Sequence, residues 1–110
     1  MGSDGPFQSD LSLDETLSVL SGKPRRELLR LLFTATDGCV SVEEAIEHLN
    51  ENISPAEARS IRNELYHVHI PKLVDSGLVE FDNRSKTLRY RPDDRLEKWM
   101  EIIDEEYEDV

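Results

Sequence analysis

Three side chains that can read nucleic-acid bases are spaced along one predicted helix. Arg59, Arg62 and Asn63 are residue types that make bidentate hydrogen bonds to the edges of guanine and adenine. At about 100° per residue, Arg59, Asn63 and Tyr66 fall on the side opposite the apolar stripe of that helix. Arg62 and His67 flank this side. The spacing predicts a helix face that contacts base edges, although arginines are also common on exposed helix faces that bind nothing.

Two further groups of basic residues suit phosphate oxygens. One group lies on a predicted hairpin and the other at the start of a predicted helix: Arg84, Lys86 and Arg89, and Lys23, Arg25 and Arg26. Residues 23–30 hold four bases against one acid, and residues 54–91 hold seven bases against five acids. We expect phosphate contacts from both groups, the alternative being solvated faces balanced by neighbouring acids.

The residues that could bind metal or perform catalysis are few and scattered. Cys39 is a single cysteine, which excludes an internal disulfide framework and a zinc site built from four thiolates. His67 and His69 are separated by about 200° around a helix, so they cannot easily chelate one ion together. A glycine-rich phosphate loop and a nucleophile elbow are both absent from the sequence. We therefore expect no metal, no cofactor and no enzymatic activity.

The elements that would position these side chains begin at capping boxes, in which a serine and a glutamate three residues later cap a helix reciprocally. The three pairs are Ser12 with Glu15, Ser41 with Glu44, and Ser54 with Glu57. They predict helices over about residues 13–20 and 42–50 and a long helix from Pro55 to Gly77. Pro24 begins a further helix that is apolar around most of its girth and ends before Asp37-Gly38.

The long helix carries most of the candidate site. Its predicted core face consists of Ala58, Ile61, Leu65 and Val68. Pro71 predicts a kink, because proline removes a backbone hydrogen bond and crowds residue 67. Residues 78–81 and 87–91 then read as a two-stranded hairpin with a basic tip, and residues 94–107 as a last helix.

This order of elements is that of a winged helix-turn-helix domain. We predict a mainly α fold with a small β-hairpin, in which the winged helix-turn-helix domain has an extra N-terminal and an extra C-terminal helix. Residues 1–10 are predicted to be a disordered N-terminal lead or the remnant of an added tag. Residues 11–91 would form the domain, and residues 92–110 would form a C-terminal helix that serves dimerisation.

A family resemblance lies at the junction of the long helix and the hairpin. The stretch LYHVHIPKLVDSGLV (residues 65–79) resembles the end of the recognition helix and the first wing strand of ArsR-like winged-helix regulators. The core HIPKL, together with the opening LSLDE (residues 11–15), resembles more narrowly a haloarchaeal branch of that group. The resemblance covers roughly residues 11–91. It implies a transcriptional regulator, usually a dimer, that presents the helix from Pro55 onward to the DNA major groove, and it carries over no metal site.

The composition describes a strongly acidic chain. Among 110 residues, 24 are Asp or Glu and 13 are Lys or Arg, so the formal net charge is −11. Many acids with few lysines favour a halophilic protein kept soluble in concentrated salt, although an acidic protein from ordinary salt could share this pattern, and an archaeal origin is implied only by the resemblance. The apolar runs fall far short of the roughly 20 residues of a membrane span, and the N-terminus lacks a signal-peptide pattern. We expect a cytoplasmic protein without a membrane partner.

An apolar stripe on the last helix could pack on its own domain or on a second copy. Because four other helices already supply a core, we predict a two-fold homodimer that uses this stripe and the first helix. The predicted dimerisation residues are Leu13, Leu17, Leu96, Trp99, Met100, Ile103 and Tyr107.

Taken together, these features predict a sequence-specific regulator of transcription that binds double-stranded DNA. The alternative is a winged-helix module that has lost DNA binding and contacts another regulator protein.

Overall fold

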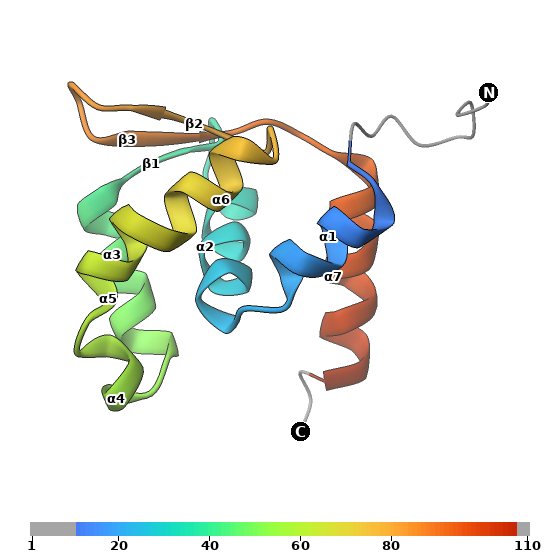
Figure 1. Ribbon diagram of the computed structural model, residues 1–110, viewed down its shortest axis with the longest axis horizontal. Helices are drawn as coiled ribbons and strands as arrows, with labels where there is room; N and C mark the ends of the chain where they lie inside the picture. Colours follow the sequence, from blue (N-terminus) through green and yellow to red (C-terminus); the bar gives the residue numbers. More distant parts are fainter. Residues whose placement is uncertain (1–10, 108–110) are drawn as a thin grey trace.

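Helices form most of the molecule, and one small antiparallel sheet accompanies them (Figure 1). The computed structural model describes residues 11–107, so the lead predicted over residues 1–10 lies outside the described residues. The helices are α1 (Leu13–Leu20), α2 (Lys23–Thr34), α3 (Val42–Asn52), α4 (Pro55–Ala58), α5 (Ile61–Glu64), a π-helical turn (Leu65–His69), α6 (Ile70–Asp75) and α7 (Asp94–Tyr107). The strands are β1 (Cys39–Ser41), β2 (Val79–Asp82) and β3 (Thr87–Tyr90).

The helix boundaries follow from local capping chemistry, as predicted. In each of the three capping boxes, the serine hydroxyl accepts from the glutamate backbone N–H, and the glutamate carboxylate accepts from the serine N–H. Gly77 follows α6 with a φ of +77°, a conformation in which glycine is favoured because it has no Cβ. The chain then reverses, because Leu78 N–H donates to the Leu73 carbonyl at 3.0 Å.

The core is built around α2. Leu28, Leu29 and Leu32 are buried, as expected for a helix with apolar residues on most of its sides. α2 runs through the middle of the molecule, with α3 on one side and α1 and α7 on the other (Figure 1). Because both sides of the molecule pack on α2, the position of each outer helix depends on the same core.

The sheet differs from the predicted two-stranded hairpin. In the described part of the chain it has three strands in the order β1-β3-β2, and both pairings are antiparallel. Leu88 of β3 lies opposite Val40 on one side and Phe81 on the other. Leu88 and Val40 are both buried, so β1 is held in the sheet by pairing with β3 and by the burial of Val40. A hairpin alone is marginal in water, and this third strand ties it to the helices.

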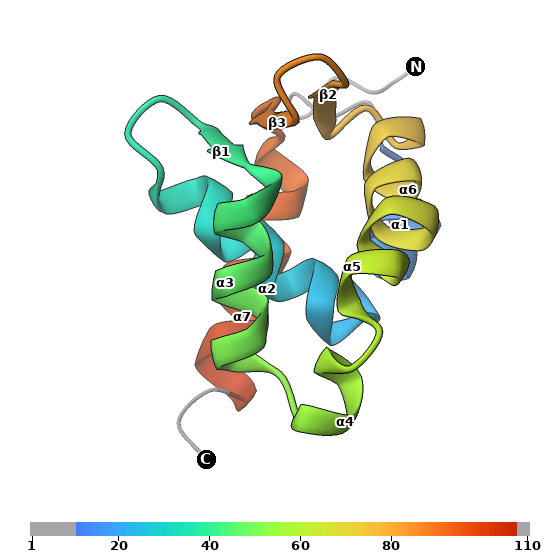
Figure 2. The same cartoon turned by 90° about the vertical axis from the view of Figure 1, so that its left-hand side faces the viewer.

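The long helix predicted from Pro55 to Gly77 is broken into segments (Figure 2). The first break falls at Ser60, whose φ of −118° and ψ of 21° are not helical. Serine favours helix starts, and Ser60 bonds forward into α5 through its carbonyl, which accepts from Glu64 N–H at 3.0 Å. The predicted interruption at Pro71 takes the form of a π turn directly before that proline, in which Ile70 N–H donates to the Leu65 carbonyl.

The π turn corrects the predicted core face. Ile61 and Leu65 are buried as expected, but Val68 is 48% exposed and His69 is only 6% exposed. A π turn spans more residues than an α turn, so the position that returns to the core moves from residue 68 to residue 69. The buried positions of this segment are therefore Ile61, Leu65, His69, Ile70 and Leu73.

None of the helices in residues 11–107 is long and apolar enough to cross a membrane.

Candidate nucleic-acid interface

The outward side of α5 and the π turn carries the predicted base-reading residues. Asn63 and His67 are exposed, and Arg59 is exposed just before the break that starts α5. Tyr66 is half-buried and packs edge-on against Phe81 of β2, with ring centroids 6.2 Å apart. The segment is thereby held against the sheet, while its amide and imidazole side chains point away from the core.

Arg62 is paired with a carboxylate on this surface. Its Nη1 and Nη2 donate to the two carboxylate oxygens of Glu43 on α3, at 2.8 and 3.0 Å. This hydrogen bonding raises the pKa of Arg62 and lowers the pKa of Glu43. Because both side chains are exposed, the pair adds little stability. A nucleic acid would have to compete with Glu43 for these donors or use the Nε edge of the guanidinium.

The loop between β2 and β3 presents the predicted hairpin bases. Asp82 accepts from the backbone N–H groups of Arg84 and Ser85, and these bonds lower the pKa of Asp82. Arg84 and Arg89 are exposed, as predicted. Lys86 is also exposed, has a φ of 55°, and donates from Nζ to the Asn83 side chain at 2.7 Å.

One backbone hydrogen bond joins the hairpin loop to the start of α3. Val42 N–H donates to the Lys86 carbonyl at 2.9 Å. Glu43, the partner of Arg62, is the next residue along α3. The structure therefore brings the hairpin loop and α5 to the same end of α3.

The third predicted basic group lies elsewhere and is corrected in part. Lys23 is exposed, and Arg26 is half-buried with its Nη1 donating to the Leu20 carbonyl at 2.6 Å. Arg25, predicted as a phosphate contact, is only 8% exposed. Its guanidinium donates to the Val19 and Ser18 carbonyls at the end of α1. Arg25 therefore holds two helices together instead of facing solvent.

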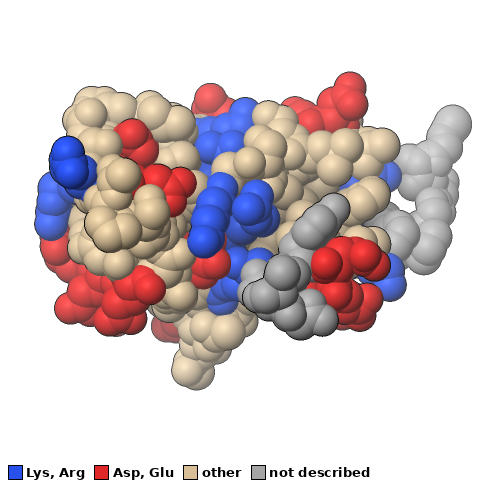
Figure 3. All heavy atoms as spheres, turned by 90° about the horizontal axis from the view of Figure 1, so that it is seen from below, with Lys and Arg blue, Asp and Glu red and all other residues tan. Residues whose placement is uncertain are grey.

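Seen from below, on the side away from the β2–β3 loop, basic side chains gather near the middle of the face and at its left edge, with acidic side chains between these two groups (Figure 3). A continuous basic stripe is thus not present on this face. The charge counts by segment could not reveal this, because they do not say which acids fold next to which bases.

The predicted dimerisation residues are also only partly available. Leu96 and Met100 are buried in the core of their own chain, and Trp99 and Ile103 pack against that core while remaining partly exposed. Leu13 and Leu17 are 47% and 44% exposed, and the Tyr107 side chain lies outside the described ones. The stripe on α7 is therefore mainly an intramolecular contact with the core of its own chain.

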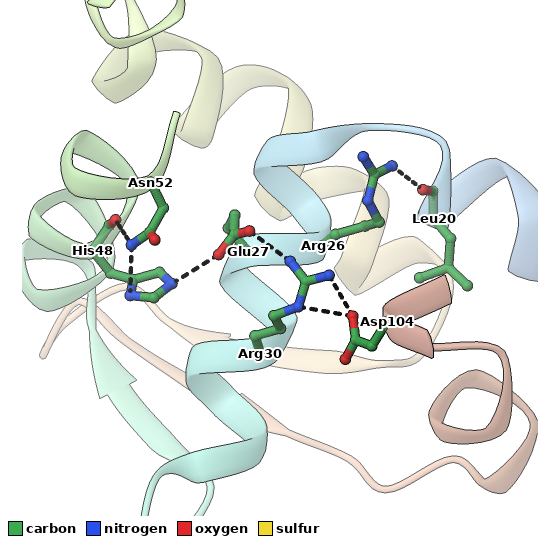
Figure 4. A network of polar contacts seen from close by, with 7 residues as sticks. All are labelled: Leu20, Arg26, Glu27, Arg30, His48, Asn52 and Asp104. Atoms are coloured by element: carbon green, nitrogen blue, oxygen red, sulfur yellow. Dashed lines mark hydrogen bonds and ion pairs between the residues drawn. The ribbon is translucent and has the colours of Figure 1, made fainter. Parts of the chain in front are cut away.

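Charged side chains reinforce this attachment of α7. Arg30 of α2 donates to Asp104 of α7 and to Glu27, and the Glu27 carboxylate lies 3.3 Å from Nε2 of His48 on α3 (Figure 4). Arg95 donates to the Leu11 carbonyl at 2.9 Å. α7 thus belongs to the same packed unit as the helices before it.

Metal ligation gains no support from the geometry. Within residues 11–107, no three His, Cys, Asp or Glu side chains are close enough together to hold a metal ion. His67 is exposed and His69 is buried, so the two histidines lie in different environments.

Comparison with known families gives one match. The model described as "Domain of unknown function (DUF7344)" matches residues 17–89. The matched stretch contains α5, the π turn and the β2–β3 loop, and it ends before α7. No curated protein and no solved structure matches the chain.

Proposed function

The chain belongs to the DUF7344 family, and from its geometry we propose that it is a sequence-specific, DNA-binding regulator of transcription. In this proposal α2, β1, α3, the segments α4 to α6 and the β2–β3 hairpin form a winged helix-turn-helix domain of ArsR-like type. The element order and the sheet order β1-β3-β2 support that assignment. The segment from α5 to α6 would be the reading helix, of which α5 and the π turn would enter the major groove, and the hairpin would act as the wing.

The observation that carries the proposal is that two exposed polar elements, α5 with the π turn and the β2–β3 loop, both contact the same end of α3. Asn63 and His67 point outward from one of them, and Arg84 from the other. Asparagine reads adenine through two hydrogen bonds, and arginine can bind either guanine or phosphate. The bond from Val42 N–H to the Lys86 carbonyl joins the loop to the start of α3, and the Arg62–Glu43 pair joins α5 to the same end of α3.

The acidic composition shapes how such binding would work. If the cytoplasm holds molar salt, the Debye length is about 3 Å and phosphate attraction is weak. Affinity would then depend mainly on base-edge contacts and on shape.

The proposal retains the homodimer, but fewer of the predicted contact residues are available for it, because Leu96 and Met100 are buried within their own chain. Leu13 and Leu17 on α1 are the predicted contacts that the chain leaves largely exposed. Two copies would place two reading helices on half-sites about 34 Å apart.

A second candidate, the protein-interaction module, is favoured by one observation. An open groove of about 570 Å³ between the end of α2 and α3 is lined by Glu44, Glu47 and Glu51, with Leu31 and Val40 also present. Such a groove suits a basic segment of another protein.

Selection of binding sequences from a random double-stranded DNA library tests the proposal. The purified protein should enrich one motif and bind it at least about 10³ times more tightly than scrambled DNA. Asn63→Ala should weaken this binding, and the matched control Lys98→Ala, on α7, should leave it unchanged. If no motif is enriched at low or high salt, DNA recognition is wrong and the interaction module replaces it.

A further inference from the structure

A buried contact between an arginine and a histidine connects α2 to the π turn. Arg25 Nη1 lies 3.1 Å from Nδ1 of His69, and both residues are buried. The other donors of Arg25 reach the Val19 carbonyl at 2.8 Å and the Ser18 carbonyl at 3.0 Å. The guanidinium therefore links the end of α1 to the middle of the candidate reading helix.

This contact requires one protonation state of His69. Arginine has donors but no acceptor, so Nδ1 must be the acceptor and the imidazole must be neutral, with its proton on Nε2. A second proton would bind at Nδ1 and point at the guanidinium. The hydrogen bond would be lost, and two positive charges would face each other inside the protein.

The surroundings favour the neutral ring. Burial lowers the pKa of His69, the charge of Arg25 lowers it further, and Glu64 of α5 opposes both effects. The pKa remains below the usual value for histidine of about 6.5. Because folding lowers the pKa of His69, the stability of the fold depends on pH. The contribution of the Arg25–His69 contact to the free energy of unfolding is fully present above about pH 6.5 and decreases as the pH falls from there.

The contact also coincides with the unusual register of the helix. An α-helical spacing would return Val68 to the core, but the π turn turns His69 inward to Arg25 and leaves Val68 exposed. Pro71 makes the turn easier to form, because it lacks the N–H that would bond to the residue 67 carbonyl. The Arg25 contact supplies the partner that a buried imidazole needs.

We propose that the Arg25–His69 hydrogen bond sets the register of the reading helix and makes it sensitive to acid. Arg25 and His69 are positioning residues, which act through the direction that they give to Asn63 and His67. When His69 takes up a proton, the π turn loses its inward anchor and the outward face rotates away from its DNA-binding direction. The link to DNA rests on the proposed function, whereas the register can be measured without DNA.

The experiment compares the unmodified protein with His69→Asn and His69→Leu. The asparagine oxygen can accept from Arg25 but cannot be protonated in this range, and leucine fills the site without an acceptor. The register is read by NMR from the coupling across the hydrogen bond between Ile70 N–H and the Leu65 carbonyl. DNA affinity is measured at several pH values between about 5 and 8, on either side of the usual histidine pKa.

In the unmodified protein, the coupling should disappear and DNA affinity should fall by up to about tenfold per protomer for each pH unit of acidification below the pKa of His69. His69→Asn should keep the coupling and lose this pH dependence. His69→Leu should lack the coupling at every pH while urea unfolding shows that the domain still folds. His67→Gln, at the exposed histidine of the same segment, serves as the control.

Two results would overturn the inference. One is a coupling that persists in His69→Leu, and the other is an acid response of His69→Asn equal to that of the unmodified protein. If the unmodified protein binds no DNA at any pH, the proposed function fails, and the NMR coupling alone decides whether this contact sets the register.

Discussion

Replacing Leu96 with alanine tests whether α7 belongs to the core of the single chain. The Leu96 side chain is 0% exposed in the isolated protein. Removing three carbon groups at about 0.8 kcal/mol each costs about 2.4 kcal/mol. The cavity that remains adds to this, so we expect the free energy of unfolding to fall by about 3 kcal/mol. Such a loss is a large part of the 5–15 kcal/mol typical of a domain.

Urea unfolding followed by far-UV circular dichroism measures this loss at constant salt. The matched control is Val74→Ala on α6, where the valine is 40% exposed and the expected loss is within about 0.5 kcal/mol. The measurement is repeated at two widely different protein concentrations, because a helix that packs only on a second copy gives a concentration-dependent midpoint. A loss below about 1 kcal/mol for Leu96→Ala, or a loss that appears only at high concentration, would refute the intramolecular packing of α7.

Three other predictions concern the candidate interface and the fold. Arg62→Ala should reduce affinity for the selected DNA by about 1–3 kcal/mol and relax its sequence preference, as measured by titration on matched and mismatched sites. Arg84→Ala should weaken binding to all sequences alike and lower the slope of log K against log salt by about 1; a change in base preference would instead assign this residue to base reading. Gly77→Ala should lower the free energy of unfolding by about 1 kcal/mol because its φ of +77° disfavours a Cβ, and an unchanged urea midpoint would contradict this.

The parts of the fold that the sequence predicts are those with local causes. The capping boxes that begin with Ser12, Ser41 and Ser54 formed as predicted, because their partners lie three residues away. Gly77 likewise ends α6 through its own backbone preference. The three residues of β1 are too few to show alternation, and their partner β3 is far away in the sequence. This strand therefore had no local signal.

The errors in the candidate site have non-local causes of the same kind. Val68 was predicted on the core face from α-helical spacing, and the contact that favours a buried His69 instead comes from Arg25, 44 residues earlier. Arg25 itself was expected at the surface because charged side chains are seldom buried. The pair of Glu43 with Arg62 was not predicted, because nothing in the spacing of these residues indicates a contact across two helices.

The two edges of the small sheet limit how copies of this chain can associate. β1 is only three residues long, and β2 carries the carboxylates Glu80 and Asp82. Short edge strands and charged side chains discourage the addition of a further strand from another molecule. The sheet is thereby protected against edge-to-edge aggregation, so stable self-association of the folded protein has to proceed through helix surfaces.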